Sequence, residues 1–142
     1  MNNPVDNRVR IDQLNAMAPG FIKMLGGKIV AVSPAEVSCA FEFDVSTDFC
    51  HSVDVVQGGF VTAMLDAAMS HAVFAAVENI ASVSSLEIKT SYLAPTRAGY
   101  QRVVGKVIKS SYQTAFLEGQ LYNAEGLLTA TASSVAKLVR TA

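Results

Sequence analysis

The stretch from Val55 to Val77 limits the fold of this chain more than any other feature. It carries Ala, Val, Phe, Met and Leu on every side, which predicts a long central helix over about residues 57–77. A helix that is apolar all round has to be surrounded by other elements. The stretch is long enough to span a bilayer, but Asp66 near its middle would cost about 2.5 to 3.5 kcal/mol there. We therefore expect a helix buried by protein and no membrane insertion.

The segments on both sides of this helix have patterns typical of strands. Residues 37–45 alternate apolar and polar side chains, and residues 28–33 before them predict a hairpin partner. Residues 46–52, STDFCHS, predict a polar loop. Four segments after the helix also predict strands, at residues 82–95, 101–110, 113–123 and 127–139. In the first of these, one face is expected to carry Leu86, Ile88, Thr90 and Tyr92.

The order of these elements is typical of an α+β fold. Residues 8–25 have apolar side chains at helical spacing, broken at Pro19 and Gly20, so we expect an N-terminal helical segment over residues 1–25. Two strands, the long helix and four strands follow, which predicts an antiparallel β-sheet. A single sheet hides an apolar helix only by wrapping around it, which is the hotdog fold. Residues 1–142 therefore predict one domain.

The sheet edges and the composition narrow the expected partners. A wrapped sheet keeps two open edges, and edge-to-edge pairing with a second copy would satisfy them, so we expect a homodimer or a homotetramer. A formal charge of -1 gives no positive field to attract nucleic acid. Two cysteines without a CxxC motif, and an N-terminus without a signal peptide, predict a cytoplasmic protein. The chain has no closely spaced set of metal ligands, so we expect neither a metal nor another cofactor.

The spacing of a few polar residues and glycines resembles a known family. His51 is followed six residues later by Gln57-Gly58-Gly59, and Asp66 lies nine residues after Gln57. Further on, Ser84-Ser85 leads to Tyr92-Leu-Ala-Pro95 and Gly99. From about Phe21 to Val139 the chain resembles the hotdog acyl-CoA thioesterases of the phenylacetic-acid-pathway (PaaI-like) type. In three positions it departs from that family, with His51 for a common Asn, Gln57 for a common His and Asp54 for a common Gly.

The glycines at the start of the helix suit the chemistry that the resemblance implies. Hydrolysis of a thioester needs a hydrogen-bond donor for the oxyanion that develops on the carbonyl. The first amides of a helix have no intrahelical partner, and Gly58 and Gly59 let a substrate approach the backbone closely. We expect the Gly58 N–H to be this donor, as the resemblance also implies. His51 or Gln57 would help to hold the carbonyl or a water molecule.

Asp66 is the expected base or nucleophile. Burial in an apolar setting favours the neutral acid, so this side chain needs donors to stay ionised, and Ser70 and Ser85 are the candidates. With Gly59, these two serines are also expected to bind substrate. Direct attack and activation of water both remain open. Because Gly58 and Asp66 are eight residues apart, or about 12 Å along a helix, one thioester cannot touch both from one chain. A site shared between two subunits follows, in agreement with the resemblance.

Two alternatives to an acyl-CoA thioesterase remain. A hotdog hydratase or dehydratase acting on an acyl-CoA would pair a histidine with an acid, and His51 with Asp66 keeps it open. A non-catalytic acyl-CoA-binding protein is the other, favoured by the departures at Gln57 and Asp54. Some large apolar residues are core candidates that could also line an acyl tunnel, namely Phe60, Met64, Met69, Phe74, Tyr92 and Phe116.

Overall fold

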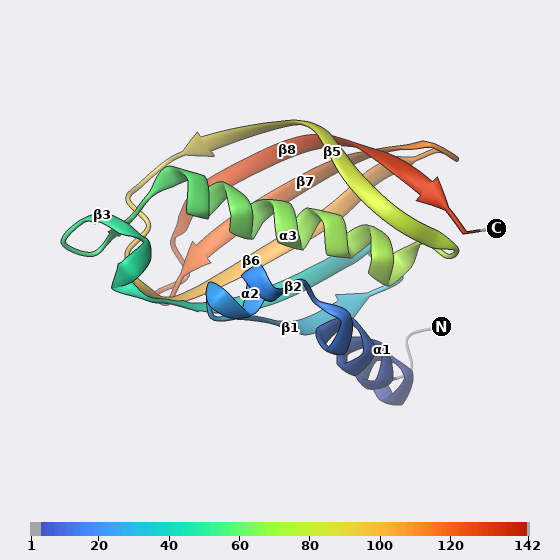
Figure 1. Ribbon diagram of the computed structural model, residues 1–142, viewed down its shortest axis with the longest axis horizontal. Helices are drawn as coiled ribbons and strands as arrows, with labels where there is room; N and C mark the ends of the chain where they lie inside the picture. Colours follow the sequence, from blue (N-terminus) through green and yellow to red (C-terminus); the bar gives the residue numbers. More distant parts are fainter. Residues whose placement is uncertain (1–3, 142) are drawn as a thin grey trace.

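The fold is given by a computed structural model that describes residues 4–141 (Figure 1). Its elements in chain order are α1 (Pro4–Met17), α2 (Gly20–Met24), β1 (Gly27–Ser33), β2 (Ser38–Val45), the 3-10 turn η1 (Thr47–Phe49), β3 (Cys50–Ser52), β4 (Val55–Val56), α3 (Gly58–Ala76), β5 (Ile80–Tyr92), β6 (Gly99–Ser110), β7 (Thr114–Asn123) and β8 (Leu128–Arg140). The expected N-terminal helical segment is thus two helices. Residues 1–3 and 142 of the expected single domain lie outside the described residues.

The six long strands form one antiparallel sheet that wraps around α3. The strands lie in the order β1-β2-β6-β7-β8-β5, with β5 joined to β8 and β2 joined to β6. Figure 1 shows the sheet curving around α3, with α1 and α2 beside β1 at one edge. This arrangement confirms the predicted α+β fold, in which an antiparallel sheet surrounds a long helix. By length and composition alone α3 could cross a membrane, and half of its most apolar window is buried inside the protein.

Two paired glycines let α3 lie directly on the sheet. Gly105 on β6 is paired with Gly119 on β7. A Cβ atom on Gly105 would stand 2.1 Å from the Ala68 carbonyl oxygen, so the backbones of helix and strand are in contact there. Around this contact the core contains fully buried side chains from α3 and β2, among them Met64, Leu65, Met69, Phe41 and Phe43.

Three aromatic core candidates lie at the surface, which corrects the sequence-based expectation. Phe116 is 49% exposed because it points to the outer face of β7. Tyr92 is 56% exposed at the end of β5, where its ring reaches the first turn of α3. Phe60, on the same turn, is 38% exposed and packs edge-on against Phe49. The buried positions of Met64 and Met69 were predicted correctly, whereas Phe74 is half-buried.

The segment expected to be a polar loop contains structure of its own. Residues 46–56 form the η1 turn and a short hairpin of β3 and β4, in place of the predicted loop at 46–52. The Ser46 hydroxyl accepts a hydrogen bond from the Asp48 amide and so begins the turn. The hairpin leads straight into α3, because the Gln57 amide donates to the Phe49 carbonyl. It therefore sets the direction from which the chain enters the helix.

The two edges of the sheet differ. At β1, the Asn15 side chain of α1 donates to the Ile29 carbonyl at 3.0 Å and accepts from the Ile29 amide at 2.8 Å. This amide side chain occupies the backbone groups of Ile29, near the middle of β1, that another strand would need there. At the other edge, within residues 4–141, β5 is paired on one side only, with β8. The outer edge of β5 is consequently the open one.

Candidate functional site

The first turn of α3 presents one free backbone amide. Gln57 is the N-cap, and its side-chain oxygen Oε1 accepts a hydrogen bond from the Gly59 amide at 2.7 Å. The Gln57 carbonyl accepts from the next two amides along the helix. Within residues 4–141 the Gly58 amide has no acceptor. It is the donor that remains for an external group, at the helix end where partial positive charge gathers.

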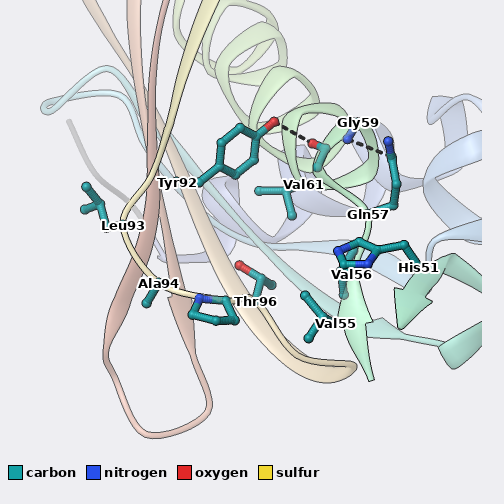
Figure 2. A pocket seen from close by; sticks show the side chains of 12 residues that line it. His51, Val55, Val56, Gln57, Gly59, Val61, Tyr92, Leu93, Ala94 and Thr96 are labelled. Atoms are coloured by element: carbon teal, nitrogen blue, oxygen red, sulfur yellow. Dashed lines mark hydrogen bonds between the residues drawn. The ribbon is translucent and has the colours of Figure 1, made fainter. Parts of the chain in front are cut away.

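Gly58 lines a cavity of about 610 Å³. Figure 2 shows the cavity between the β3–β4 hairpin, the start of α3 and the end of β5. Four predicted site residues line it, His51, Gln57, Gly58 and Gly59. The rest of the wall is mainly apolar and comes from Val55, Val56, Val61 and residues 92–96. An apolar cavity with a few convergent polar groups is the usual form of a small-molecule site.

The other three predicted site residues form a separate group. Asp66 on α3 is half-buried, and its carboxylate oxygen accepts a hydrogen bond from the Ser85 hydroxyl at 2.7 Å. The Ser70 hydroxyl, one turn along the helix, is a longer contact at 3.5 Å. Both serines were predicted as donors to Asp66. Two hydroxyl groups therefore lie beside the Asp66 carboxylate, and that of Ser85 is the closer one.

A β-bulge brings Ser85 to Asp66. The pairing of β5 with β8 shifts register between Ser85 and Glu87, so Leu86 is an additional residue in the strand. Leu86 is 64% exposed and does not share a face with Ile88, which corrects the predicted alternation. Without the bulge, the period of two would turn Leu86 toward the helix and Ser85 away from it. The bulge therefore places the hydroxyl beside the carboxylate.

The two groups occupy different parts of one helix face. Gly58, Thr62, Asp66 and Ser70 follow each other at a spacing of four residues, so they form a stripe along α3. Asp66 does not line the cavity that contains Gly58. Eight residues of helix separate the two by about 12 Å. A single chain thus holds the amide donor and the carboxylate apart.

A tyrosine that the sequence analysis placed in the core belongs to this site. The Tyr92 hydroxyl donates to the Gly58 carbonyl at 2.8 Å and lies 3.0 Å from the Thr62 hydroxyl. Thr62 is in turn 2.8 Å from the hydroxyl of Thr90 on β5. The motif Tyr92-Leu-Ala-Pro95 was the available signal, because all four of its residues line the cavity.

Asp54, one of the departures from the family pattern, supports the cavity wall. Its carboxylate lies 2.7 Å from the Arg97 guanidinium, and both side chains are well exposed. Its carbonyl also accepts from the Ala98 amide at 2.8 Å. Nearby, the Val56 amide donates to the Thr96 carbonyl at 2.8 Å. These contacts join the β3–β4 hairpin to the segment after β5, and both segments contribute residues to the cavity wall.

The second histidine lies outside the cavity. His71 is buried in α3, where its Nδ1 atom is 2.8 Å from the Ala67 carbonyl and its ring packs edge-on against Phe41. Burial lowers the pKa of His71, although the Ala67 carbonyl and the charge of Asp66 act in the opposite direction. Within the described part of the chain, no three His, Cys, Asp or Glu side chains lie close enough together to hold a metal ion.

Comparison with known proteins yields one family and many similar folds. The profile of the thioesterase superfamily matches residues 54–130. An uncharacterized protein of Schizosaccharomyces pombe is 29% identical over 85 residues, which are 59% of this chain and 48% of that protein. The chain thus spans about half the length of that relative.

Solved structures match over nearly the whole chain. A phenylacetic acid degradation-related protein of Ralstonia eutropha JMP134 has a TM-score of 0.82 at 29% identity, covering 90% of this chain and 98% of that one. The Escherichia coli PaaI protein from the phenylacetic acid degradation operon has a TM-score of 0.82 at 15% identity, covering 94% of each chain. A Haemophilus influenzae thioesterase has a TM-score of 0.82 at 19% identity, covering 92% of this chain and 90% of that one. The last two show a common fold.

The matched region contains most of the groups described above. It starts at the β3–β4 hairpin and runs through the first turn of α3, Asp66 and Ser85 into β8. It covers more than half of the 142 residues. The chain therefore belongs to the thioesterase superfamily, and its fold is that of the PaaI-like hotdog thioesterases.

Proposed function

We propose that this protein is an acyl-CoA thioesterase, which hydrolyses a thioester to a free acid and CoA. Membership of the thioesterase superfamily supports the reaction class, and the resemblance to PaaI-like enzymes supports CoA as the thiol. The observation that carries the proposal is the pairing of two groups on one helix. These are the free Gly58 amide at the cavity and the Asp66 carboxylate held by Ser85.

In this proposal the thioester carbonyl accepts a hydrogen bond from the Gly58 amide. The helix N-terminus stabilises the negative charge that develops on that oxygen. His51 and the Nε2 atom of Gln57, which line the same cavity, help to hold the carbonyl or a water molecule. Gly59, Ser70 and Ser85 complete the substrate-binding set.

Asp66 supplies the second half of the chemistry. It either attacks the carbonyl carbon to form a mixed anhydride, which water then hydrolyses, or takes a proton from the water that attacks. In both routes the C–S bond breaks, the sulfur leaves as the CoA thiolate and takes up a proton, and the acyl group leaves as an acid. The Ser85 hydrogen bond holds the Asp66 carboxylate in a fixed orientation.

The separation along α3 supports a site shared between two copies of the chain. The Gly58 amide of one subunit would face the partner's Asp66 across the open edge of β5. A two-fold axis that makes this contact also makes its reciprocal, so each dimer has two equal sites. Thr62, midway between the two residues, would then face its own copy at the axis. A dimer is the smallest active form, and a tetramer is a pair of such dimers.

Mixed dimers test the shared site. Asp66→Ala subunits and Gly58→Leu subunits are each expected to be inactive, because every site in a homodimer lacks one group. After unfolding and refolding together, a mixed dimer has one site with both groups. Random mixing should restore about a quarter of the wild-type activity. A mixture of Asp66→Ala with Asp66→Asn subunits is the control, and it should restore none. No recovery in mixed dimers verified by mass would contradict the shared site.

One assay separates the proposed reaction from the two alternatives. Purified protein is incubated with short, long and aromatic acyl-CoAs, and release of free thiol is followed. Release that disappears in Asp66→Ala, with the oligomer intact, supports hydrolysis. Hydration of an enoyl-CoA without thiol release would favour the hydratase, and binding without turnover would favour an acyl-CoA-binding protein.

A further inference from the structure

The peptide group between Gly58 and Gly59 is held at both of its ends. Its carbonyl accepts from the Tyr92 hydroxyl at 2.8 Å, and its N–H donates to Oε1 of Gln57 at 2.7 Å. Figure 2 draws both hydrogen bonds, with Tyr92 and Gln57 on either side of this turn of α3. One partner is adjacent in sequence, whereas the other comes from the far end of β5. This peptide is the one that follows the free Gly58 amide.

Two successive glycines at a helix end would otherwise be poorly fixed. Glycine has a wide range of backbone conformations, and the first turn of a helix frays. An oxyanion donor is effective only if it already points to the place where charge develops. Fixing the plane of the Gly58–Gly59 peptide fixes the backbone on one side of the Gly58 N–H. The Gln57 side chain, bound to Gly59, holds the residue on the other side.

Tyr92 is itself held in place by a chain of hydroxyl groups. Its hydroxyl lies 3.0 Å from that of Thr62, which lies 2.8 Å from that of Thr90. The ring also packs on the helix, since a Cβ atom on Gly58 would stand 3.0 Å from the Tyr92 hydroxyl oxygen and 3.1 Å from Cζ. The end of β5 and the start of α3 are thus joined at a defined distance.

We infer that Gln57 and Tyr92 act jointly as positioning residues, by clamping the Gly58–Gly59 peptide so that the Gly58 amide points into the cavity. This inference rests on the proposed thioesterase function. It also gives the two polar atoms of the Gln57 side chain different roles. Oε1 accepts the hydrogen bond from the Gly59 amide, and Nε2 remains available to bind substrate.

Two single variants and their combination test the clamp. Tyr92→Phe removes the hydroxyl and keeps the ring, and Gln57→Met removes the acceptor and keeps the length of the side chain. Each releases the same peptide, so Tyr92→Phe should lower kcat by about 10-fold and change KM by less than about twofold, and Gln57→Met, which also removes Nε2, should lower kcat by at least as much. The double variant should be no slower than the slower single variant, because the peptide is already free. If the two residues acted independently, their effects on kcat would multiply to a loss of about 100-fold in the double variant. That result would overturn the inference.

Matched variants elsewhere control for the chemical change. Tyr100→Phe removes a tyrosine hydroxyl that contacts Glu42 on the outer face of the sheet. Gln120→Met makes the same glutamine replacement on the outer face of β7, away from the cavity. Both should keep the wild-type kcat, and all variants should keep the wild-type oligomer and melting temperature within a few degrees.

Amide exchange of Gly59 tests the clamp without turnover. Solvent-exchange NMR should find this amide protected in the wild type and exchanging about 10-fold faster in Gln57→Met, which removes its acceptor, and in Tyr92→Phe, which frees the peptide. Unchanged exchange in Tyr92→Phe would overturn the inference. If the wild type hydrolyses no acyl-CoA, the proposed function fails, yet exchange still decides on the clamp. If it does hydrolyse and both variants keep kcat, the clamp fails and the proposed function stands.

Discussion

Replacing Gly105 by alanine should destabilise this protein more than its small size change suggests. The new Cβ atom would stand 2.1 Å from the Ala68 carbonyl oxygen and 2.4 Å from the Met69 amide nitrogen. An ordinary carbon–oxygen contact is about 3.4 Å, so strand and helix would have to separate by more than 1 Å, on the order of a full bond length. Because both obstacles are backbone atoms, no rotamer change relieves them.

The size of the effect follows from the kind of obstacle. Overpacking a core commonly costs about 1 to 3 kcal/mol, and a clash with rigid backbone belongs at the upper end, so we expect a loss of about 3 kcal/mol in the free energy of unfolding. In a chain of this length that corresponds to roughly 10 °C in melting temperature. Separation of α3 from the sheet would also disturb the 2.7 Å contact between Ser85 and Asp66, so thioesterase activity should fall as well.

Gly119 provides the matched control, because it is the cross-strand partner of Gly105. An added Cβ there would meet the Leu65 Cδ2 atom at 3.1 Å and the Met69 Cγ atom at 3.2 Å. These side chains can rotate, so Gly119→Ala should cost about 1 kcal/mol or less. Urea unfolding of both variants at one protein concentration measures the difference. If Gly105→Ala were within about 1 kcal/mol of Gly119→Ala, the backbone contact would not have the rigidity argued for it.

Three further outcomes are expected. Ser85→Ala removes the close donor to Asp66 and should lower kcat about 10-fold, whereas Ser84→Ala on the exposed neighbour should not, as thiol release would measure. Burial raises the pKa of Cys39 from 9.0 to about 12, so the unfolded chain loses this proton first as pH rises. Deprotonation of this thiol should lower the free energy of unfolding by about 1.4 kcal/mol per pH unit between those two pKa values. The urea midpoint of Cys39→Val should lack this decrease with pH. Burial lowers the pKa of His71, so stability should fall as pH drops below 6.5, and less so in His71→Gln.

Long, regular patterns made the main elements predictable. The apolar stretch predicted a helix over about 57–77, and α3 spans Gly58–Ala76. The alternation over 37–45 matches β2, which spans Ser38–Val45. The β3–β4 hairpin was missed because strands of three and two residues are too short to show a period. Local patterns therefore identified the elements that carry most of the core.

The missed features of the site depend on contacts between distant residues. Ser85 is predicted as a donor to Asp66, but nothing in the alternation of β5 marks the bulge that places it there and leaves Leu86 exposed. Tyr92 is predicted as a core candidate that could also line an acyl tunnel, whereas in the structure it lines the cavity and its hydroxyl donates to the Gly58 carbonyl. The side-chain cap of Gln57 was also hidden, since glutamine is not among the common N-cap residues.

The Asn15 contact with β1 limits how copies of this chain can join. A strand of another molecule can pair with any sheet edge whose backbone N–H and C=O groups are unpaired. A molecule with two such edges can assemble with its copies into a fibre. Here the amide of Asn15 occupies the N–H and C=O of Ile29 on β1, with the two hydrogen bonds that a neighbouring strand would make there. Pairing of two copies through β5 would then use the unpaired backbone groups of the β5 edge in each copy. If two copies pair through β5, that edge is used up in both, and at the opposite edge Asn15 covers the Ile29 groups.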